Sequence, residues 1–373
     1  MLLHPIAVAI NFFSTTALFI IAGLCGMKEL SAEIAIAQGA IIAVFLSLSG
    51  IARSLVLSDQ TDDSEQNIFK FRLFMVLPAV LGSFYLSSTI IEISAELLCI
   101  LILRKASEWL LEIELANKEK YNSSRFACIY VFSNAFSFLI ILIHFISQST
   151  KETIYFSLCF WALIPVLFLL PKICRSDNRK KDNFKFIRYI PSIGSSTIIG
   201  ITVYVFRVLI VLLAGKAIAG EIFTAYALGG LASSIYIYVI GPTIISKNKN
   251  KSEKIVLRSS VALIAAGLAL ALVSRFVEQN LFSSLFVDAV IFSIVGGGVM
   301  LLAQHKKLHI IHIFDKDVFI PDTLSNILFL SSVPFVFYYF GSGSLSFLFL
   351  WSALLNLMLY SVATMKIKNF RDA

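Results

Sequence analysis

Charged side chains that could contact an ionic ligand lie inside long apolar segments of this 373-residue sequence. Arg104, Lys105, Glu108 and Glu112 fall within about a third of a helical circumference, because successive residues of an α-helix are about 100° apart. The i, i+4 pairs Arg104/Glu108 and Glu108/Glu112 put one cation and two acids in a row. Arginine forks suit phosphate and carboxylate oxygens where water is scarce. The pattern therefore indicates an anion-binding site or an internal ion pair.

Arg53 and Arg207 are two more cations inside apolar segments. A cation at the centre of a membrane helix costs about 2.5–3.5 kcal/mol on insertion scales. Arg53 lies near the end of its segment and could extend to the lipid headgroups instead. For Arg104 and Arg207 we predict a water-filled interior cavity, with a buried structural ion pair as the alternative. With Arg53 and Lys105, they are the candidate substrate-binding cations.

The acids of the same region are candidates for ion coupling. Glu92, Glu96, Glu108 and Glu112 lie in the segment 91–114, where carboxylates could take up H⁺ or Na⁺ during transport. The alternative is that this segment leaves the membrane early, so that Glu108 and the residues after it form a solvated cytoplasmic extension.

We predict no metal, no cofactor and no catalytic residue. His305, His309 and His312 share a helical face by their spacing, but they adjoin Lys306 and Lys307 at a membrane boundary. The five cysteines are scattered singly and show no metal-binding spacing. The sequence also contains no phosphate-binding glycine loop and no hydrolase or metalloprotease motif.

The segments that carry these residues are long and apolar. The chain is 58% hydrophobic and 14% charged, with a mean hydropathy of +0.86, whereas a soluble domain has about 25% charged residues. Apolar stretches of about 20 residues match the length of a helix that crosses a bilayer. We predict an all-α polytopic membrane protein with twelve transmembrane helices, at 5–27, 34–58, 69–88, 91–114, 125–147, 153–171, 190–214, 218–245, 255–274, 281–303, 318–340 and 345–365.

The basic residues predict the orientation of these helices. Most of the 31 Lys and Arg residues lie in every second gap between segments, among them Lys70, Arg72, Lys172, Lys306 and Lys307. Under the positive-inside rule these gaps and both termini are cytoplasmic. Retention on the cytoplasmic side accounts for the net charge of +8, so we expect membrane lipids and no nucleic acid as partners.

The chain divides into two halves that resemble each other. We predict a six-helix bundle at 1–171, a basic cytoplasmic linker at 172–189 and a second six-helix bundle at 190–373. Lys, Glu, Ile and Ala recur at identical spacing in 28–37 and 216–225. Six helices is an even number, so the halves point the same way. Such parallel repeats are typical of transporters with a substrate path between the halves.

This combination resembles the Wzx-type polysaccharide flippases of the multidrug/oligosaccharidyl-lipid/polysaccharide exporter superfamily. The likeness covers the whole chain through its predicted helices. Local patterns that carry it are Gly50-Ile-Ala-Arg53, Arg104-x-x-x-Glu108-Trp109-Leu-Leu-Glu112-Ile113, Gly194-Ser-Ser and Gly220-Glu-Ile-Phe-Thr-Ala-Tyr226-Ala227. The chain is shorter than many members of the family, and its segment 91–114 is unusually acidic.

The resemblance implies a transporter of the bacterial inner membrane and not an enzyme. It implies flipping of undecaprenyl-diphosphate-linked oligosaccharides by alternating access, for O-antigen, capsule, lipopolysaccharide or another surface polysaccharide. It also implies a cationic cavity and a polysaccharide polymerase machinery as a partner. A multidrug or small-solute exporter of the same superfamily is one alternative. A glycan polymerase or ligase is another, but such an enzyme should have a long outer loop, and the outer gaps here are short.

Overall fold

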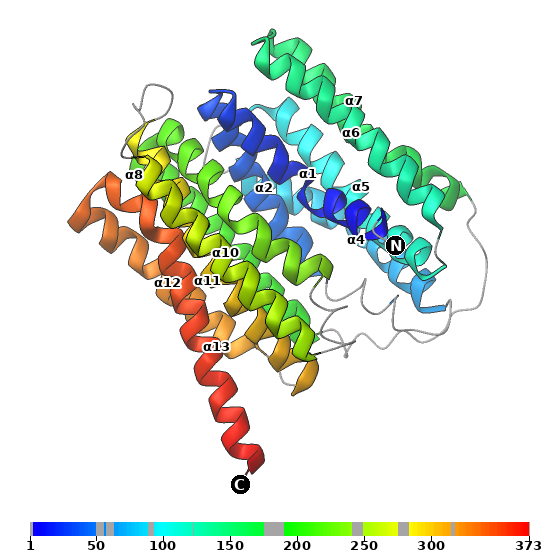
Figure 1. Ribbon diagram of the computed structural model, residues 1–373. Coiled ribbons are helices and arrows are strands. Elements are labelled where there is room, and N and C mark those ends of the chain that lie inside the picture. The colour runs from blue at the N-terminus through cyan, green and yellow to red at the C-terminus, as the bar shows by residue number, and fades with distance from the viewer. Residues whose placement is uncertain are drawn as a thin grey trace. The chain divides into compact units, whose positions relative to one another are not determined.

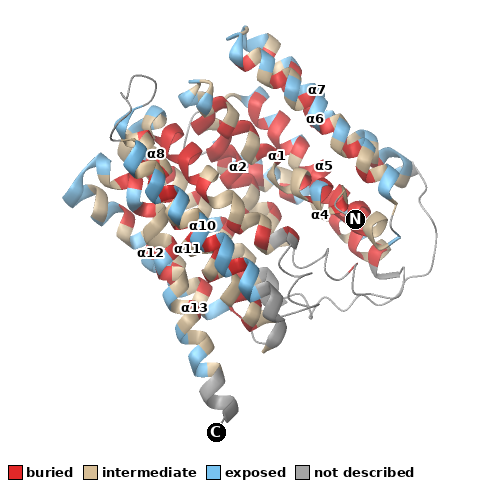
Figure 2. Ribbon diagram, in the orientation of Figure 1, coloured by how far each residue is buried: buried red, intermediate tan, exposed pale blue. Residues whose placement is uncertain are grey.

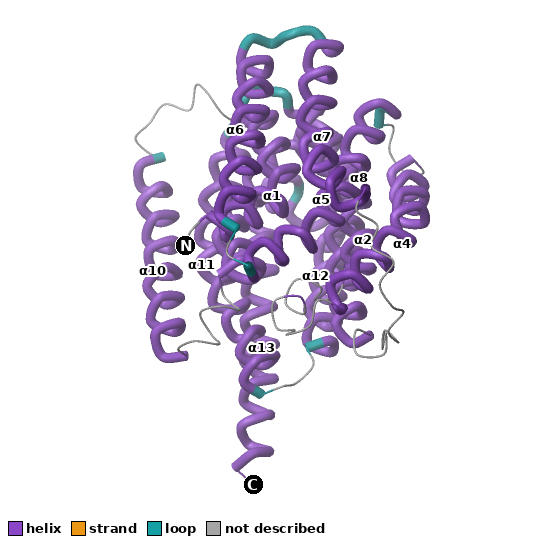
Figure 3. Tube along the Cα trace, turned by 90° about the vertical axis from the view of Figure 1, so that its right-hand side faces the viewer, coloured by secondary structure: helices purple, strands orange, loops and turns teal. Residues whose placement is uncertain are grey.

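The computed structural model describes residues 3–49, 56, 63–88, 93–121, 123–174, 190–240, 249–274, 283–314 and 318–372. Within these ranges the chain is helical and shows no strand (Figures 1 and 3). The α-helices are α1 (Leu3–Leu24), α2 (Lys28–Ser49), α4 (Asp63–Ser88), α5 (Ala95–Lys120), α6 (Ser124–Ile146), α7 (Lys151–Cys174), α8 (Ile190–Ile235), α10 (Lys249–Val273), α11 (Ser284–Ile313), α12 (Phe319–Phe340) and α13 (Leu348–Asp372). A π-helical turn, η2 (Tyr236–Ile240), follows α8, and a 3₁₀-helix, η3 (Ser342–Phe347), precedes α13.

Ten helices of the described ranges are long and apolar enough to cross a membrane. Helix α5 is not among them, because its charged residues interrupt the apolar sequence. The predicted segments 190–214 and 218–245 both begin in α8, which Gly215 interrupts with a non-helical backbone. The described residues thus show a polytopic all-helical protein, and the predicted number of twelve crossings stays a prediction.

Several helices extend beyond the apolar segments that predicted them. Helix α4 begins at Asp63 and α11 ends at Ile313, so Lys70, Arg72, Lys306 and Lys307 lie within helices. The gaps between apolar segments that hold these lysines and arginines are therefore helical in part. Hydropathy marks only the apolar part of a helix, whereas the backbone hydrogen bonds continue into polar residues that find partners in the protein.

Glycines mark backbone turns beside α2 and within α8, and serines cap the first turns of α5 and α11. Gly26, before α2, and Gly215, within α8, have φ angles of +83° and +82°, a region that residues with a Cβ seldom adopt. Ser94 and Ser283 cap the first turns of α5 and α11 by accepting hydrogen bonds from the backbone N–H groups of Leu97 and Phe286.

The chain folds into two compact units. Unit 1 comprises Met1–Met27 and Glu33–Tyr204, and unit 2 comprises Lys28–Ala32 and Val205–Ala373. Two helices therefore contribute to both units: α2 is divided after Ala32, and α8 is divided after Tyr204. The predicted division into bundles at 1–171 and 190–373 stays a prediction.

In unit 1 the charged helix α5 is enclosed by its neighbours. It contacts α1, α4, α6 and α7, and it is buried along most of its length (Figure 2). The surrounding helices direct large apolar side chains outward, such as Phe74 on α4, Phe132 on α6 and Phe156 on α7. Apolar helices therefore face outward and shield the charges of α5 from lipid.

In unit 2 the central helix is α11, as α5 is in unit 1. Three consecutive glycines allow α11 to pack closely against the neighbouring helices. A Cβ on Gly297 would lie 2.2 Å from the carbonyl oxygen of Gly229 on α8. A Cβ on Gly298 would lie 2.8 Å from the carbonyl oxygen of Ser260 on α10, and one on Gly296 would lie 2.8 Å from the ring of Phe349 on α13. Successive residues point about 100° apart, so each glycine admits a different helix.

Candidate functional site

The acids of α5 lie inside the protein. Glu108 is 1% exposed, and Glu112 and Glu114 are also buried. These carboxylates are therefore not part of a solvated extension, which was the alternative for the segment 91–114. Burial of an ionised carboxylate is costly unless it is paired, so each should have a cationic partner.

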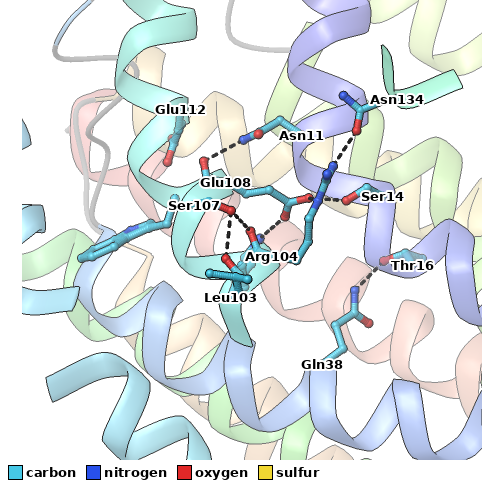
Figure 4. A network of polar contacts seen from close by, with 12 residues as sticks. Asn11, Ser14, Thr16, Gln38, Leu103, Arg104, Ser107, Glu108, Glu112 and Asn134 are labelled. Atoms are coloured by element: carbon cyan, nitrogen blue, oxygen red, sulfur yellow. Dashed lines mark hydrogen bonds and ion pairs between the residues drawn. The ribbon is translucent and has the colours of Figure 1, made fainter. Parts of the chain in front are cut away.

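Arg104 is the partner of Glu108. Its guanidinium is 0% exposed, and Nε donates to Oε1 of Glu108 at 2.6 Å. Nη1 donates to the carbonyl of Trp161 on α7 at 2.7 Å. Nη2 donates to Oδ1 of Asn134 on α6, also at 2.7 Å (Figure 4). The guanidinium also lies 4.4 Å from the centroid of the Trp161 ring. Arg104 thus forms the buried structural ion pair that the sequence left as the alternative to a cavity.

The pair extends into a hydrogen-bond network that joins four helices. Ser14 on α1 donates to Oε1 of Glu108, and Asn11 on α1 donates to the backbone carbonyl of Glu108 at 3.0 Å (Figure 4). Tyr130 on α6 donates to Oδ1 of Asn11 at 3.0 Å. These contacts and those of Arg104 connect α1, α5, α6 and α7. A polar network of this kind fixes how helices rotate against one another, because few other arrangements satisfy it.

Lys105 is the second cation beside Glu108. Its Nζ lies 3.7 Å from Oε2 of Glu108 and 5.8 Å from the ring centroid of Phe12 on α1. Its side chain is 18% exposed, in contrast to the fully buried Arg104. Since Arg104 and Glu108 neutralise each other, Lys105 gives this cluster a net positive charge that is accessible in part.

Two further ion pairs follow along α5. Arg72 on α4 contacts Oε2 of Glu112 at 2.7 Å and lies 4.9 Å from the ring centroid of Trp109. Farther along, Lys172 on α7 contacts Glu114 at 2.8 Å, and it also pairs with Glu65 on α4. Arg72 and Lys172 were used to predict topology, but here they neutralise the acids of α5. The predicted cytoplasmic location of both termini therefore depends on the other basic residues and stays a prediction.

Unit 2 holds a buried pair that the sequence analysis missed. Lys307 on α11 contacts Oδ2 of Asp322 on α12 at 2.8 Å, and Tyr360 on α13 donates to Oδ1 of Asp322. All three side chains are buried. Asp322 could have been noticed, because it is the only acid in α12 and an isolated acid in an apolar helix normally has a partner.

Replacing Lys307 by alanine should destabilise the protein by about 3 kcal/mol, because the Asp322 carboxylate would stay buried without its cation. Lys306 is adjacent and only partly buried, so Lys306→Ala should cost less than about 0.5 kcal/mol. Thermal unfolding of the purified variants in detergent measures the difference. Equal melting temperatures for the two alanine variants would contradict the role of the buried pair.

The remaining predicted residues are distributed over both units. Arg207 on α8 is partly buried, with its guanidinium 5.9 Å from the ring centroid of Phe223. Glu96 is exposed in the first turn of α5. Arg53 and Glu92 lie outside the described residues. Unit 1 thus contains Arg104, Lys105, Glu108 and Glu112, whereas Arg207 belongs to unit 2.

The histidine face is built differently from a metal site. Nδ1 of His305 lies 2.7 Å from the hydroxyl of Tyr236 in the π-helical turn η2, and the rings of His305 and His309 are 5.5 Å apart. The side chain of His312 lies outside the described part of the chain. Within that part, no group of three His, Cys, Asp or Glu side chains is close enough to hold a metal ion.

These features define a multi-pass membrane protein with two helical units and buried ionic networks. Its fold is similar to that of a solved multidrug resistance transporter of the MATE family, a member of the MOP superfamily, in its inward-facing conformation. The likeness has a TM-score of 0.52 and covers 100% of this chain and 96% of the other, at 10% sequence identity. At this identity the likeness shows the fold alone. Neither a known protein family nor a curated protein matches the sequence.

Proposed function

We propose that the protein is a transporter that moves an anionic, lipid-linked substrate across the bacterial inner membrane by alternating access. The proposed substrate is an undecaprenyl-diphosphate-linked oligosaccharide for O-antigen, capsule or another surface polysaccharide. The fold similarity supports the transporter class, and the solved neighbour is in an inward-facing conformation. A polysaccharide polymerase machinery would receive the flipped product.

The proposal of an anionic substrate rests mainly on the surplus positive charge at Lys105. Glu108 lies against two cations, and Arg104 already satisfies its Oε1. The ammonium of Lys105 is the more exposed of the two and is held at 3.7 Å, which is longer than a tight ion pair. A diphosphate oxygen could therefore take the place of Glu108 as its partner. Arg207 is the partly exposed candidate cation of unit 2.

The same geometry narrows the choice of coupling residue. Glu108 and Glu112 each pair with a buried arginine at 2.6–2.7 Å. Both carboxylates are therefore already engaged in buried structural ion pairs. Among the four candidates, we therefore assign H⁺ or Na⁺ coupling to Glu92 and Glu96, of which Glu96 is exposed.

A multidrug exporter is the second candidate, because the solved neighbour of similar fold is a multidrug resistance transporter. The two functions differ in the chemistry of the substrate. Many multidrug substrates would need an apolar or acidic site, whereas a diphosphate needs cations. Substitution of the accessible cations should therefore distinguish a flippase for a diphosphate-linked substrate from a multidrug exporter.

Lys105→Ala and Arg207→Ala should each lower flipping by about tenfold or more, because each removes a charge-assisted contact to phosphate. Lys105→Arg keeps the positive charge and should retain most of the activity. Surface polysaccharide in a flippase-deficient strain, at matched expression of each variant, measures the effect. Full polysaccharide from both alanine variants would overturn the anionic site. If the protein confers drug resistance on an efflux-deficient strain, and if neither alanine substitution lowers that resistance, the multidrug exporter is favoured.

A further inference from the structure

The first turn of α2 packs with a different unit from the rest of its helix. Lys28–Ala32 belongs to unit 2, whereas the body of α2, from Glu33 onward, belongs to unit 1. Helix α2 is continuous across this division, and it contains neither glycine nor proline before Gly39. Sharp bends in helices arise at such residues, so the first turn should move with the body of the helix.

Polar groups hold this first turn to the second arm of α8. Lys28 forms an ion pair with Oε1 of Glu221, and Ser283, which caps α11, donates to Oε2 of Glu221 at 2.5 Å. The hydroxyls of Ser31 and Thr224 are hydrogen-bonded at 3.1 Å, and both side chains are fully buried. The first turn is therefore held to α8 by an ion pair and by a hydrogen bond between two hydroxyls.

Small residues allow the two backbones to approach closely here. A Cβ on Gly220 would lie 2.0 Å from the carbonyl oxygen of Lys28, so only glycine fits at this position of α8. The Lys28 side chain is 45% exposed, which keeps the ion pair weak in energy. A contact that is close but held by a weak ion pair can separate and form again.

We infer that Lys28–Ala32 is a releasable latch on α8, held by Glu221, Gly220 and Thr224, which detaches when the two units move during transport. The inference rests on the proposed function, since alternating access requires such movement. Either the latch releases or α2 bends after Ala32, and the uninterrupted helix favours release. The glycine turns at Gly26 and Gly215 directly precede the two segments that meet in the latch.

A disulfide tests whether release is required. In a variant without native cysteines, Ser31→Cys and Thr224→Cys should crosslink on oxidation, because the native hydroxyls are 3.1 Å apart. Crosslinking should abolish transport, and reduction should restore it. The matched control is Val44→Cys with Gly82→Cys, which joins α2 to α4 within unit 1, where a Cβ on Gly82 meets Val44 at 3.6 Å. This second crosslink should leave transport within about twofold.

Two outcomes of the crosslinking experiment overturn the latch. One is that the double variant Ser31→Cys/Thr224→Cys does not crosslink, and the other is that the crosslinked protein transports as well as the reduced one. An equal loss of transport in the control pair would also overturn it, because crosslinking anywhere along α2 would then be inhibitory.

A labelling experiment needs no substrate and so separates failure of the latch from failure of the proposed function. Maleimide should label a single Ser31→Cys variant about threefold to fivefold faster when Glu221→Gln removes the ion pair. Glu29→Gln, at an exposed acid in the same turn, is the charge-matched control and should change nothing. Ser293→Cys, fully buried elsewhere in unit 2, should stay unlabelled in both backgrounds.

Equal labelling of the Ser31→Cys variant with and without Glu221→Gln would overturn the latch. The opposite combination, in which labelling responds to Glu221→Gln but the cysteine-free parent moves neither lipid-linked glycan nor drug, would support the latch and refute the proposed function.

Discussion

Replacing Arg104 by alanine is expected to destabilise the protein by about 3–5 kcal/mol, a large share of the stability of a typical domain. The substitution leaves the Glu108 carboxylate buried beside Lys105 alone, and it removes the donors to Asn134 and to the Trp161 carbonyl. Thermal unfolding in detergent, followed by size-exclusion chromatography, measures the loss. We expect little folded Arg104→Ala protein at about 37 °C.

Substituting both Arg104 and Glu108 shows whether the unpaired charge is the cause of the destabilisation. Adding Glu108→Gln to Arg104→Met removes both charges, and two neutral groups of similar size should restore part of the stability that Arg104→Ala loses. Arg125, an exposed cation at the start of α6, is the matched control, and Arg125→Ala should cost less than about 0.5 kcal/mol. If Arg104→Ala melts with the parent protein, Arg104 is not the structural centre of unit 1, and a substrate-binding role for it regains support.

Replacing Gly229 by alanine is expected to have the largest effect of any glycine substitution in α8 apart from Gly220. Its Cβ would lie 2.1 Å from the carbonyl oxygen of Ser293, and both atoms belong to helix backbones that cannot shift alone. Gly230 is adjacent in the same helix, and its Cβ would meet only the Phe349 ring at 3.5 Å, an ordinary contact. The two positions therefore gain the same helix propensity from alanine but differ in the space available.

We expect Gly229→Ala and Gly230→Ala to differ in stability by about 3 kcal/mol, with Gly230→Ala equal to or slightly above the parent. Their melting temperatures in detergent are compared directly, and Gly297→Ala, across the same contact, should behave like Gly229→Ala. Similar melting temperatures for Gly229→Ala and Gly230→Ala would show that α8 and α11 are not packed as closely as described.

The apolar segments could be predicted well because the signal is local. About 20 consecutive apolar residues indicate a membrane helix whatever surrounds them, and each predicted segment overlaps a helix of the described structure. The repeat of Lys, Glu, Ile and Ala in 28–37 and 216–225 stays a prediction, although Lys28 contacts Gly220 and Glu221 in the structure.

The partners of the buried charges could not be predicted, because they come from distant parts of the sequence. Arg104 and Glu108 are one turn apart, and their pairing was visible in the spacing, but Asn134 and the Trp161 carbonyl depend on how α6 and α7 are placed. The sequence placed Lys307 among the cytoplasmic charges, but in the structure it pairs with Asp322 of α12. A hydropathy profile averages over residues that are neighbours in the sequence. The partner of a buried charge, in contrast, is a residue that is its neighbour in space.

The sequence by itself determined that this is a membrane protein of many helices, and which of its residues are charged against the apolar background. Only the tertiary structure decided which of those charges are used internally. It gave each guanidinium nitrogen of Arg104 a buried acceptor and left Lys105 partly exposed, although both are cations and they are adjacent in the sequence. The physical reason is that neighbouring helical residues point about 100° apart, so the packing around α5 alone determines which cation is buried.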